Sequence, residues 1–147
     1  MGIDGPTDHS DLRVMSTDEC LGRLASTPIG RVGFACDGEI LVLPVHHVVR
    51  GTDIYFRTAG GSKIEAASDH SPMGFEVDGH DASPHASTVP TGWSVTVSGA
   101  GFVVDDDELV RELEQLHGGG WLVGDPDAQV WIGLRSHTIA GRELRGA

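Results

Sequence analysis

The chain has 147 residues and a formal net charge of −12 at pH 7, with 10 basic residues against 22 acidic ones. Its length fits one domain that can bury a core without disulfides or metal. The negative charge argues against a nucleic-acid-binding role, because the basic residues are scattered along the chain and form no concentrated basic face.

No run of apolar residues approaches the roughly 20 that span a membrane, so no membrane association is expected. The N-terminal residues also lack the cationic start and apolar block of a signal peptide, and we therefore place the protein in the cytoplasm. Residues 1–14 contain two glycines, a proline and several polar residues, which predicts a flexible leader before a single ordered domain at residues 15–145.

A helix followed by a β-hairpin is predicted after the leader. Ser16 and Glu19 have the spacing of a capping box, which marks a helix start, and the helix should end before Pro28. Between residues 32 and 36 apolar side chains occupy every second position, as in a half-buried strand. Asp37-Gly38 is a typical two-residue hairpin turn, so the next strand should pair antiparallel with this one.

The returning strand, at residues 40–45, is apolar at every position. Such a run is expected where both faces of a strand are buried, so we predict a barrel strand that is covered from outside. After a turn at residues 50–53, another strand runs from Ile54 to Thr58.

The only lysine of the chain, Lys63, follows this strand in the segment FRTAGGSKIEAA. A glycine-rich turn at residues 59–61 leads into a short helix predicted over residues 62–69, whose start offers unpaired backbone N–H groups. Side chains that can bind an anion gather around this turn, namely Arg57, Thr58, Ser62 and Lys63. The combination is typical of a phosphate-binding site. The alternative is a surface turn with scattered charges.

Three strands and one helix are predicted in the second half of the chain. The strands lie at residues 73–77, 93–104 and 130–134, the last continuing to about residue 140, and a polar loop is expected at residues 78–92. The helix begins after Asp105, which has capping-box spacing to Glu108, and ends at Gly118. Its apolar stripe consists of Leu109, Leu113 and Leu116. The elements alternate as hairpins without strand–helix–strand repeats, which predicts a mainly β (α+β) fold built on a six-stranded antiparallel barrel with short peripheral helices.

Two adjacent histidines, His46 and His47, are the candidate catalytic residues. Neighbours on a strand point to opposite faces, so the pair cannot chelate one metal ion. A histidine facing a ligand can donate a hydrogen bond or carry a proton. The alternative is a barrel histidine that bonds a nearby carbonyl. The spacing of His70, His80 and His85 fits no tetrahedral site, and no metal is expected.

Four segments in this order resemble a known family. They read IGRVGFACDGEILVLPVHHVV, DIYFRTAGGSKIEAA, MGFEVDG and TGWSVTVSGAGFVV. Together, over residues 16–142, they are similar to the FMN-binding split-barrel proteins related to pyridoxamine 5′-phosphate oxidase, particularly the short actinobacterial type. The resemblance implies a six-stranded antiparallel split β-barrel that forms a homodimer, with FMN in a cleft at the subunit interface.

The resemblance also implies which residues bind the cofactor. The strand Leu43-Pro44-Val45-His46 corresponds to the one whose backbone lies along the isoalloxazine ring. Arg57 and Thr58 correspond to a pair that reaches ribityl and phosphate oxygens. Ser62 and Lys63 correspond to the phosphate-binding pair of the family.

Three positions refine this assignment. The oxidases usually carry a second basic residue directly after the first, where this chain has Ile64, so we infer that Arg57 supplies the second cation. Trp93 opens a strand, and the resemblance implies that this region approaches the cofactor from the partner subunit, where the indole could stack on the flavin ring or cover its edge. The alternative is a tryptophan of the core or of an interface. The oxidases end in an Arg-x-His stretch, whereas residues 141–145 here read GRELR, so the chain is not expected to be a true pyridoxamine 5′-phosphate oxidase.

The sequence therefore predicts an FMN-dependent oxidoreductase that acts on an unidentified small molecule, with NADH or NADPH as a possible electron donor. A flavin-binding or flavin-sensing module without turnover is the alternative from another functional class. A third possibility keeps the fold but uses F420 or haem in place of FMN.

Overall fold

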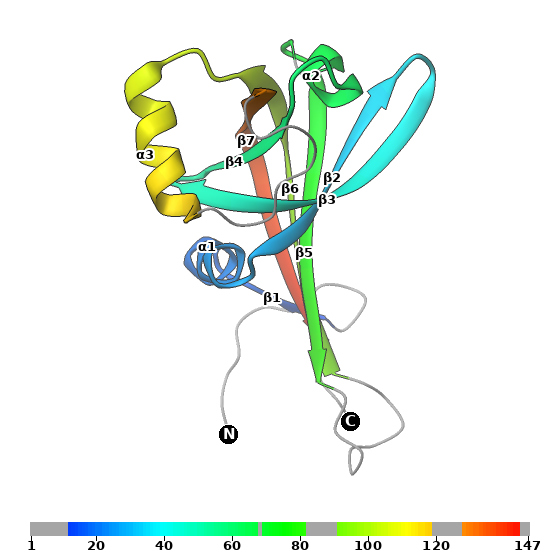
Figure 1. The fold of residues 1–147 in the computed structure, drawn as a ribbon. Helices are drawn as coiled ribbons and strands as arrows, with labels where there is room; N and C mark the ends of the chain where they lie inside the picture. The colour runs from blue at the N-terminus through cyan, green and yellow to red at the C-terminus, as the bar shows by residue number, and fades with distance from the viewer. Residues whose placement is uncertain (1–11, 68, 82–90, 119–127, 145–147) are drawn as a thin grey trace.

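The computed structural model describes residues 12–67, 69–81, 91–118 and 128–144 (Figure 1). Strands and helices follow one another as β1 (Arg13–Val14), α1 (Thr17–Ser26), β2 (Ile29–Cys36), β3 (Glu39–Arg50), β4 (Asp53–Ala59), α2 (Lys63–Ala67), β5 (Pro72–Asp81), β6 (Thr91–Val103), α3 (Asp107–His117) and β7 (Gln129–Leu144). No helix in these ranges is long and apolar enough to cross a membrane.

Strands β2 to β7 close into a six-stranded antiparallel barrel. The sheet order is β1-β7-β4-β3-β2-β5-β6, and an additional β6–β7 pairing closes the ring. The short strand β1 adds to the end of β7 through the pairs Arg13↔Glu143 and Val14↔Arg142. The predicted six-stranded barrel with short peripheral helices is therefore confirmed, although β1 lies within the predicted leader.

The barrel is split between β3 and β4. Their ladder contains four residue pairs, from Arg50↔Asp53 to His47↔Phe56. Beyond the last pair the two strands part. There, among the described residues, residues 39–46 of β3 pair with β2 alone, and residues 57–59 of β4 pair with β7 alone. Figure 1 shows the β2–β3 hairpin projecting away from the end of β4 and α2. We call this parting of the two strands the fork.

Local sequence signals set the helix and turn boundaries. Ser16 and Glu19 form the predicted capping box of α1. The hairpin turn has positive φ at both Asp37 (52°) and Gly38 (80°), as this tight turn requires. The start of α3 is shifted by one residue from the prediction, because Asp106, not Asp105, accepts hydrogen bonds from the N–H groups that follow it.

Two predictions for the second half of the chain were incomplete. Residues 78–81 and 91–92, expected in a loop, extend β5 and β6, which pair as far as Asp81↔Thr91. Residues 82–90, the centre of that predicted loop, lie outside the described residues. The last strand is one continuous element of 16 residues, which pairs with β4 at its start and with β6 along most of its length.

The hydrophobic core fills the barrel and continues beneath α3. Inside the barrel the main cluster includes Leu24 of α1 and Phe56, Val95 and Ile132 of the strands. A second cluster packs between α3 and the outer face of the barrel, and consists of Val48, Tyr55, Val104, Leu113 and Trp131. Leu116, predicted in the buried stripe of α3, is exposed, and His117 is buried in its place.

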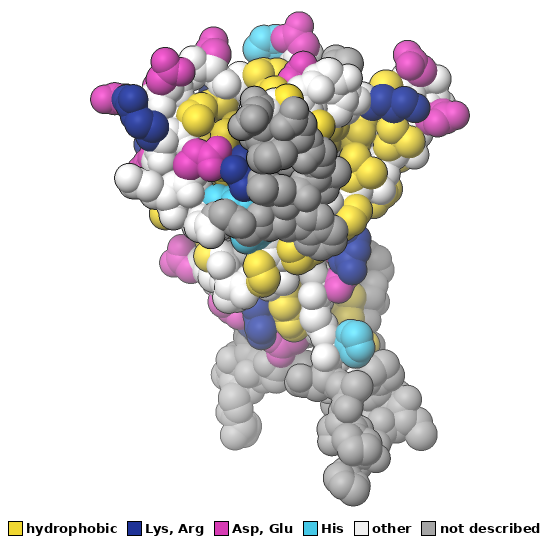
Figure 2. All heavy atoms as spheres, in the orientation of Figure 1, with side chains coloured by type: hydrophobic (Ala, Val, Ile, Leu, Met, Phe, Trp, Pro, Cys, Tyr) yellow, Lys and Arg dark blue, Asp and Glu magenta, His cyan; other side chains and the backbone are white. Residues whose placement is uncertain are grey.

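Strand β3 is not buried on both faces as predicted. Ile40 is 74% exposed and Val42 is 62% exposed, and both belong to the outer face of the β2–β3 hairpin. Figure 2 shows hydrophobic side chains at the upper right, where Figure 1 places this hairpin. The prediction was wrong for the single chain because no other described element packs over that face.

Candidate functional site

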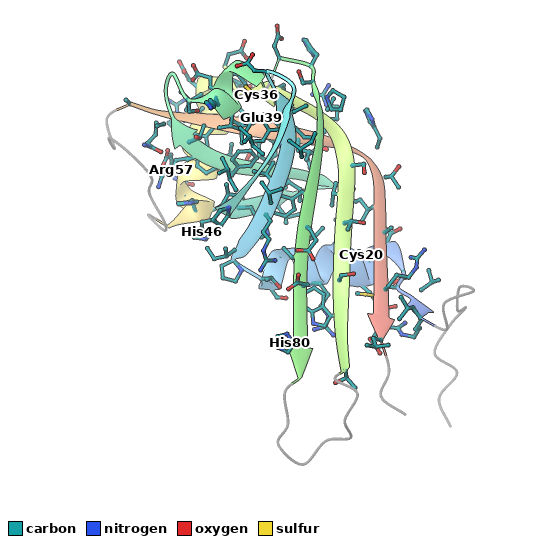
Figure 3. The ribbon with its side chains drawn as sticks, turned by 90° about the vertical axis from the view of Figure 1, so that its right-hand side faces the viewer. Cys20, Cys36, Glu39, His46, Arg57 and His80 are labelled. Carbon is teal, nitrogen blue, oxygen red and sulfur yellow. The ribbon has the colours of Figure 1, made fainter. Side chains whose placement is uncertain are left out.

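The base of the fork brings together residues from β3 and β4. His46 and Arg57 lie one position beyond the last shared pair, His47↔Phe56, on the side where the two strands part. Because His47 and Phe56 are buried, the alternation of side chains along a strand turns His46 and Arg57 toward the outer face. Figure 3 shows both residues on the same side of the barrel, beside α3.

Arg57 is held by two residues of α3. Its Nη1 donates to Glu114 Oε2 at 2.8 Å, and its Nη2 lies 3.2 Å from His117 Nδ1. The guanidinium also lies 5.7 Å from the centre of the Trp131 ring, whose Nε1 donates to Glu114 Oε1 at 2.8 Å. Glu114 therefore bridges Arg57 and Trp131 and ties α3 to β4 and β7.

His117 and His46 are neutral at pH 7. The pKa of His117 is lowered to about 4, mainly by burial and further by the positive charge of Arg57. Burial and Arg57 also lower the pKa of His46, whose ring centre lies 4.2 Å from that of His117. A neutral His117 can accept the Arg57 hydrogen bond at Nδ1, which assigns its proton to Nε2. His46 keeps a neutral ring, partly exposed, at the fork.

His47 faces the opposite side of the strand. It is 5% exposed, and its Nε2 donates to the carbonyl oxygen of Leu24 in α1 at 2.7 Å. Its ring also packs edge-on against Phe75, and burial lowers its pKa. Of the two candidate catalytic histidines, His46 reaches the fork and His47 is placed in the barrel histidine role that the sequence left open.

The predicted phosphate-binding residues lie on the β4–α2 connection. Thr58 Oγ1 and Ser62 Oγ are 3.3 Å apart, and Ser62 Oγ also accepts from the N–H of Glu65. The turn between them is tightly packed, because a Cβ at Gly60 would lie 2.9 Å from the carbonyl oxygen of Ala128. Lys63 is exposed at the start of α2. Thus the hydroxyls of Thr58 and Ser62 lie together at the end of β4, and Lys63 is the next residue along the chain.

Arg57 differs from this group in two ways. It points to the other face of β4 from Thr58, and its guanidinium already has an acidic partner in Glu114. Both orientations can serve one ligand at the fork, because residues 57–59 of β4 have no pairing to β3 in the described chain. A ligand placed between the two strands would have Thr58 on one side and Arg57 on the other.

Trp93 lies at the other end of the barrel. Its ring lies against Gly79, where a Cβ would be 2.7 Å from the indole nitrogen, and the guanidinium of Arg23 lies 4.6 Å from the ring centre. Figure 3 marks this end by His80, well below Arg57 and His46. Within one chain, Trp93 therefore does not join the fork residues.

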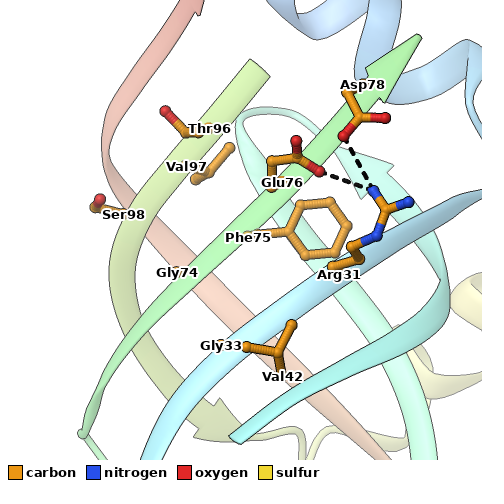
Figure 4. A pocket seen from close by; sticks show the side chains of 10 residues that line it. All are labelled: Arg31, Gly33, Val42, Gly74, Phe75, Glu76, Asp78, Thr96, Val97 and Ser98. Atoms are coloured by element: carbon orange, nitrogen blue, oxygen red, sulfur yellow. Dashed lines mark hydrogen bonds and ion pairs between the residues drawn. The ribbon is translucent and has the colours of Figure 1, made fainter. Parts of the chain in front are cut away.

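An open pocket of about 380 Å³ lies on the outer face of the sheet (Figure 4). Small residues, Gly33, Gly74 and Ser98, leave the space, and Val42 of the exposed hairpin borders it. At one end Arg31 Nη1 donates to Glu76 at 3.0 Å and to Asp78 at 3.2 Å. The pKa of Glu76 is raised, chiefly by burial and then by Asp78. The pocket is continuous with the exposed apolar face of β3.

Sequence reasoning missed Glu114 and His117 and gave Trp131 no part in the site. The two α3 residues are three positions apart and therefore share a helix face. Their spacing, next to the buried Leu113, was the available signal. It indicates which side of α3 meets the barrel, but not which strand residue it meets.

The model of the pyridoxamine 5′-phosphate oxidase family matches residues 16–143 of the chain. The chain belongs to this family. An uncharacterised protein of Mycobacterium tuberculosis (strain ATCC 25618 / H37Rv) is 30% identical over 138 residues, which cover 94% of this chain and 84% of that protein.

Solved structures of the family share the fold. The FAD binding protein from Mycobacterium smegmatis has a TM-score of 0.72 and 29% identity, covering 90% of this chain and 99% of that one. A putative pyridoxamine 5′-phosphate oxidase from Corynebacterium glutamicum has a TM-score of 0.73 and 23% identity, covering 99% of both chains. Family membership and the split barrel expected from the sequence are thus confirmed.

Proposed function

We propose that the chain binds a flavin nucleotide in the fork between β3 and β4. The ring would lie along Leu43-Pro44-Val45-His46. The phosphate would bind the side chains of Thr58, Ser62 and Lys63, with Arg57 as the second cation. The observation that carries the proposal is the fork itself, where two strands part beside a pair of hydroxyls 3.3 Å apart. Hydroxyl donors and an ammonium group suit a phosphate, since charge-assisted hydrogen bonds are the strong ones.

FMN is the proposed cofactor, and FAD is the second candidate. FAD has support from the Mycobacterium smegmatis structure, which is described as an FAD binding protein. Both nucleotides carry the isoalloxazine ring and a phosphate on the ribityl chain, so the residues named above suit either one. F420 and haem are further alternatives for this fold.

The proposed activity is an oxidoreduction of a small molecule, with NADH or NADPH as electron donor. A bound flavin would supply the hydride and electron transfer. The chain would supply binding, orientation and hydrogen bonds. His46 is suited to this role, because a neutral imidazole can donate one hydrogen bond to a ligand carbonyl and accept a proton at its other nitrogen. A flavin-binding module without turnover uses the same site.

A second copy of the chain is the proposed partner. The exposed Ile40 and Val42 and the pocket beside them leave an apolar face on β2 and β3 that a homodimer would cover. A two-fold arrangement would also give Trp93 a route to the fork of the other subunit, which it does not have within its own chain.

The absorption spectrum of the purified protein, followed by titration with FMN, FAD and riboflavin, tests the proposal. Flavin binding is expected, with a preference for a nucleotide that carries the ribityl phosphate. A deazaflavin or haem spectrum would mean that the fold binds that cofactor in place of a flavin. Failure of all three flavins to bind at micromolar concentration would contradict the proposed function.

Turnover is tested separately on the flavin-loaded protein. We expect reduction by NADH or NADPH and reoxidation by an added acceptor. We expect no efficient conversion of pyridoxamine 5′-phosphate, because residues 141–145 read GRELR where the oxidases have an Arg-x-His stretch. Bound flavin that no nicotinamide reduces would favour the binding module over the enzyme.

A further inference from the structure

We propose that Glu114 is a specificity-determining residue that competes with the ligand phosphate for Arg57. The inference rests on the proposed function, since it concerns the same fork. The Glu114 carboxylate is paired with Arg57, the cation nearest the base of the fork. This pairing weakens the binding of phosphorylated flavins relative to unphosphorylated ones.

The first support is how fully Arg57 is engaged. Both terminal nitrogens contact α3, one at Glu114 and the other at His117, and the side chain is only 10% exposed. Its third nitrogen, Nε, is buried, so a ligand does not reach it in this arrangement. A phosphate that approaches Arg57 therefore meets an ion pair with no net charge, and has to displace Glu114 to form a direct salt bridge.

The second support is that Glu114 can be displaced. Its side chain is 43% exposed, so the carboxylate can be hydrated when it leaves Arg57. One of its oxygens accepts from Trp131 Nε1, which would hold it near the site. The two histidines of the cluster are neutral at pH 7 and supply no further positive charge. Glu114 and a phosphate therefore compete for one cation.

The test compares FMN with riboflavin, which has the same ring and ribityl chain but no phosphate. In Glu114→Gln the amide oxygen can still accept from Trp131 Nε1, while the negative charge is lost. We expect the preference for FMN over riboflavin, measured as the ratio of the two dissociation constants, to rise at least about tenfold. Glu114→Asp keeps the charge, and its ratio should stay near that of the wild type.

Glu112→Gln is the matched control. Glu112 lies on the same helix, has similar exposure and is paired with Arg50 at 2.6 Å, so this variant removes one charge without touching Arg57. Its ratio should equal that of the wild type. In a second control, Arg57→Gln combined with Glu114→Gln should show no gain over Arg57→Gln alone, because the effect passes through Arg57.

Three outcomes overturn the inference. An unchanged ratio in Glu114→Gln means that Glu114 does not compete, and a lower ratio means that it holds Arg57 ready for the phosphate. An equal gain in Glu112→Gln means that only total charge matters. If wild-type protein binds no flavin, the proposed function itself fails, which is a separate result.

A measurement on the wild-type protein covers the case in which the variant does not fold. The Nε–H resonance of Arg57, assigned with Arg57→Lys, should shift with FMN far more than with riboflavin, because only the phosphate changes the partner of the guanidinium. Equal shifts with both ligands would overturn the inference.

Discussion

At the scale of single residues, the proposed phosphate-binding site depends on the exposed ammonium group of Lys63. Lys63 is the only lysine and directly follows Ser62, whose hydroxyl lies 3.3 Å from that of Thr58. The two hydroxyls alone would make neutral-donor hydrogen bonds, which are weaker than charge-assisted ones. The site therefore contains one residue whose loss should affect the phosphate without affecting the fold.

Lys63→Ala is expected to weaken FMN binding by at least about tenfold, because a charge-assisted hydrogen bond contributes about 1.5–3 kcal/mol. Riboflavin binding should be unchanged. Isothermal titration or flavin fluorescence measures both affinities. Arg111→Ala, which removes the same charge from the exposed surface of α3, is the control and should alter neither. Equal weakening of both ligands by Lys63→Ala would contradict the assignment.

His117 makes the stability of the folded chain depend on pH. Its pKa is about 4 in the folded chain, below the ordinary value of 6.5, mainly because of burial. The unfolded state therefore binds the proton more readily than the folded state between these two values. The stabilisation is fully present above pH 6.5 and is lost as the pH falls toward 4.

Urea unfolding at pH 7 and at pH 5 tests this effect. We expect the free energy of unfolding to fall less between these pH values in His117→Gln than in the wild type, since glutamine has no proton to bind. Carboxylates contribute to both proteins alike and cancel in the comparison. The same fall in both proteins would show that His117 is not the group responsible.

At the scale of the elements, α3 carries Glu114 and His117 to the fork and has to be well anchored. Its C-terminus ends at Gly118 in the left-handed conformation, with φ of 66°, and the N–H of Gly118 donates to the carbonyl oxygen of Glu114. Its N-terminus depends on Asp106, whose Oδ1 accepts from two backbone N–H groups. Both ends of α3 are thus capped.

Asp106→Ala should lower the free energy of unfolding by about 1 kcal/mol, the usual cost of losing an N-cap. Asp105→Ala, which changes the same residue type one position earlier, should have little effect, because the side chain that accepts the hydrogen bonds of the helix start is that of Asp106. Urea unfolding of the two variants measures the difference. A larger loss of stability in Asp105→Ala than in Asp106→Ala would show that Asp105 is the N-cap, as the sequence predicted.

At the scale of the whole molecule, the exposed face of β2 and β3 is the feature that a single barrel leaves unexplained. Ile40 and Val42 project from it, and the pocket lined by Gly33 and Gly74 continues it. A contiguous apolar face of this kind marks an interaction surface more often than a solvated one. The proposed homodimer would cover it.

Val42→Asp is therefore expected to shift the protein from dimer to monomer, because a dimer contact would bury the new carboxylate without a partner. Leu116→Asp is the control, since Leu116 is also an exposed apolar residue but lies on α3. Sedimentation or light scattering at micromolar concentration gives the mass. A wild-type monomer, or equal dissociation by both variants, would contradict the proposed interface.

The sequence by itself determined the parts of this protein that depend on neighbours along the chain. The Ser16–Glu19 capping box, the Asp37-Gly38 turn and the alternation along β2 each involve residues a few positions apart, and each is confirmed. The grouping of Thr58 with Ser62 is also local, because a tight turn separates them by four positions. Such features follow from backbone geometry and short-range hydrogen bonds.

Only the tertiary structure decided what lies opposite each strand face. Arg57 contacts Glu114 and His117, which lie 57 and 60 positions further along the chain, so no local periodicity predicts these contacts. The same holds for the choice of His46 over His47 at the fork, since it depends on α1 packing over one face of β3. The apolar run at residues 40–45 was misread for the same reason: hydrophobicity shows that a surface favours burial, whereas the arrangement of the other elements determines whether anything in the chain covers it.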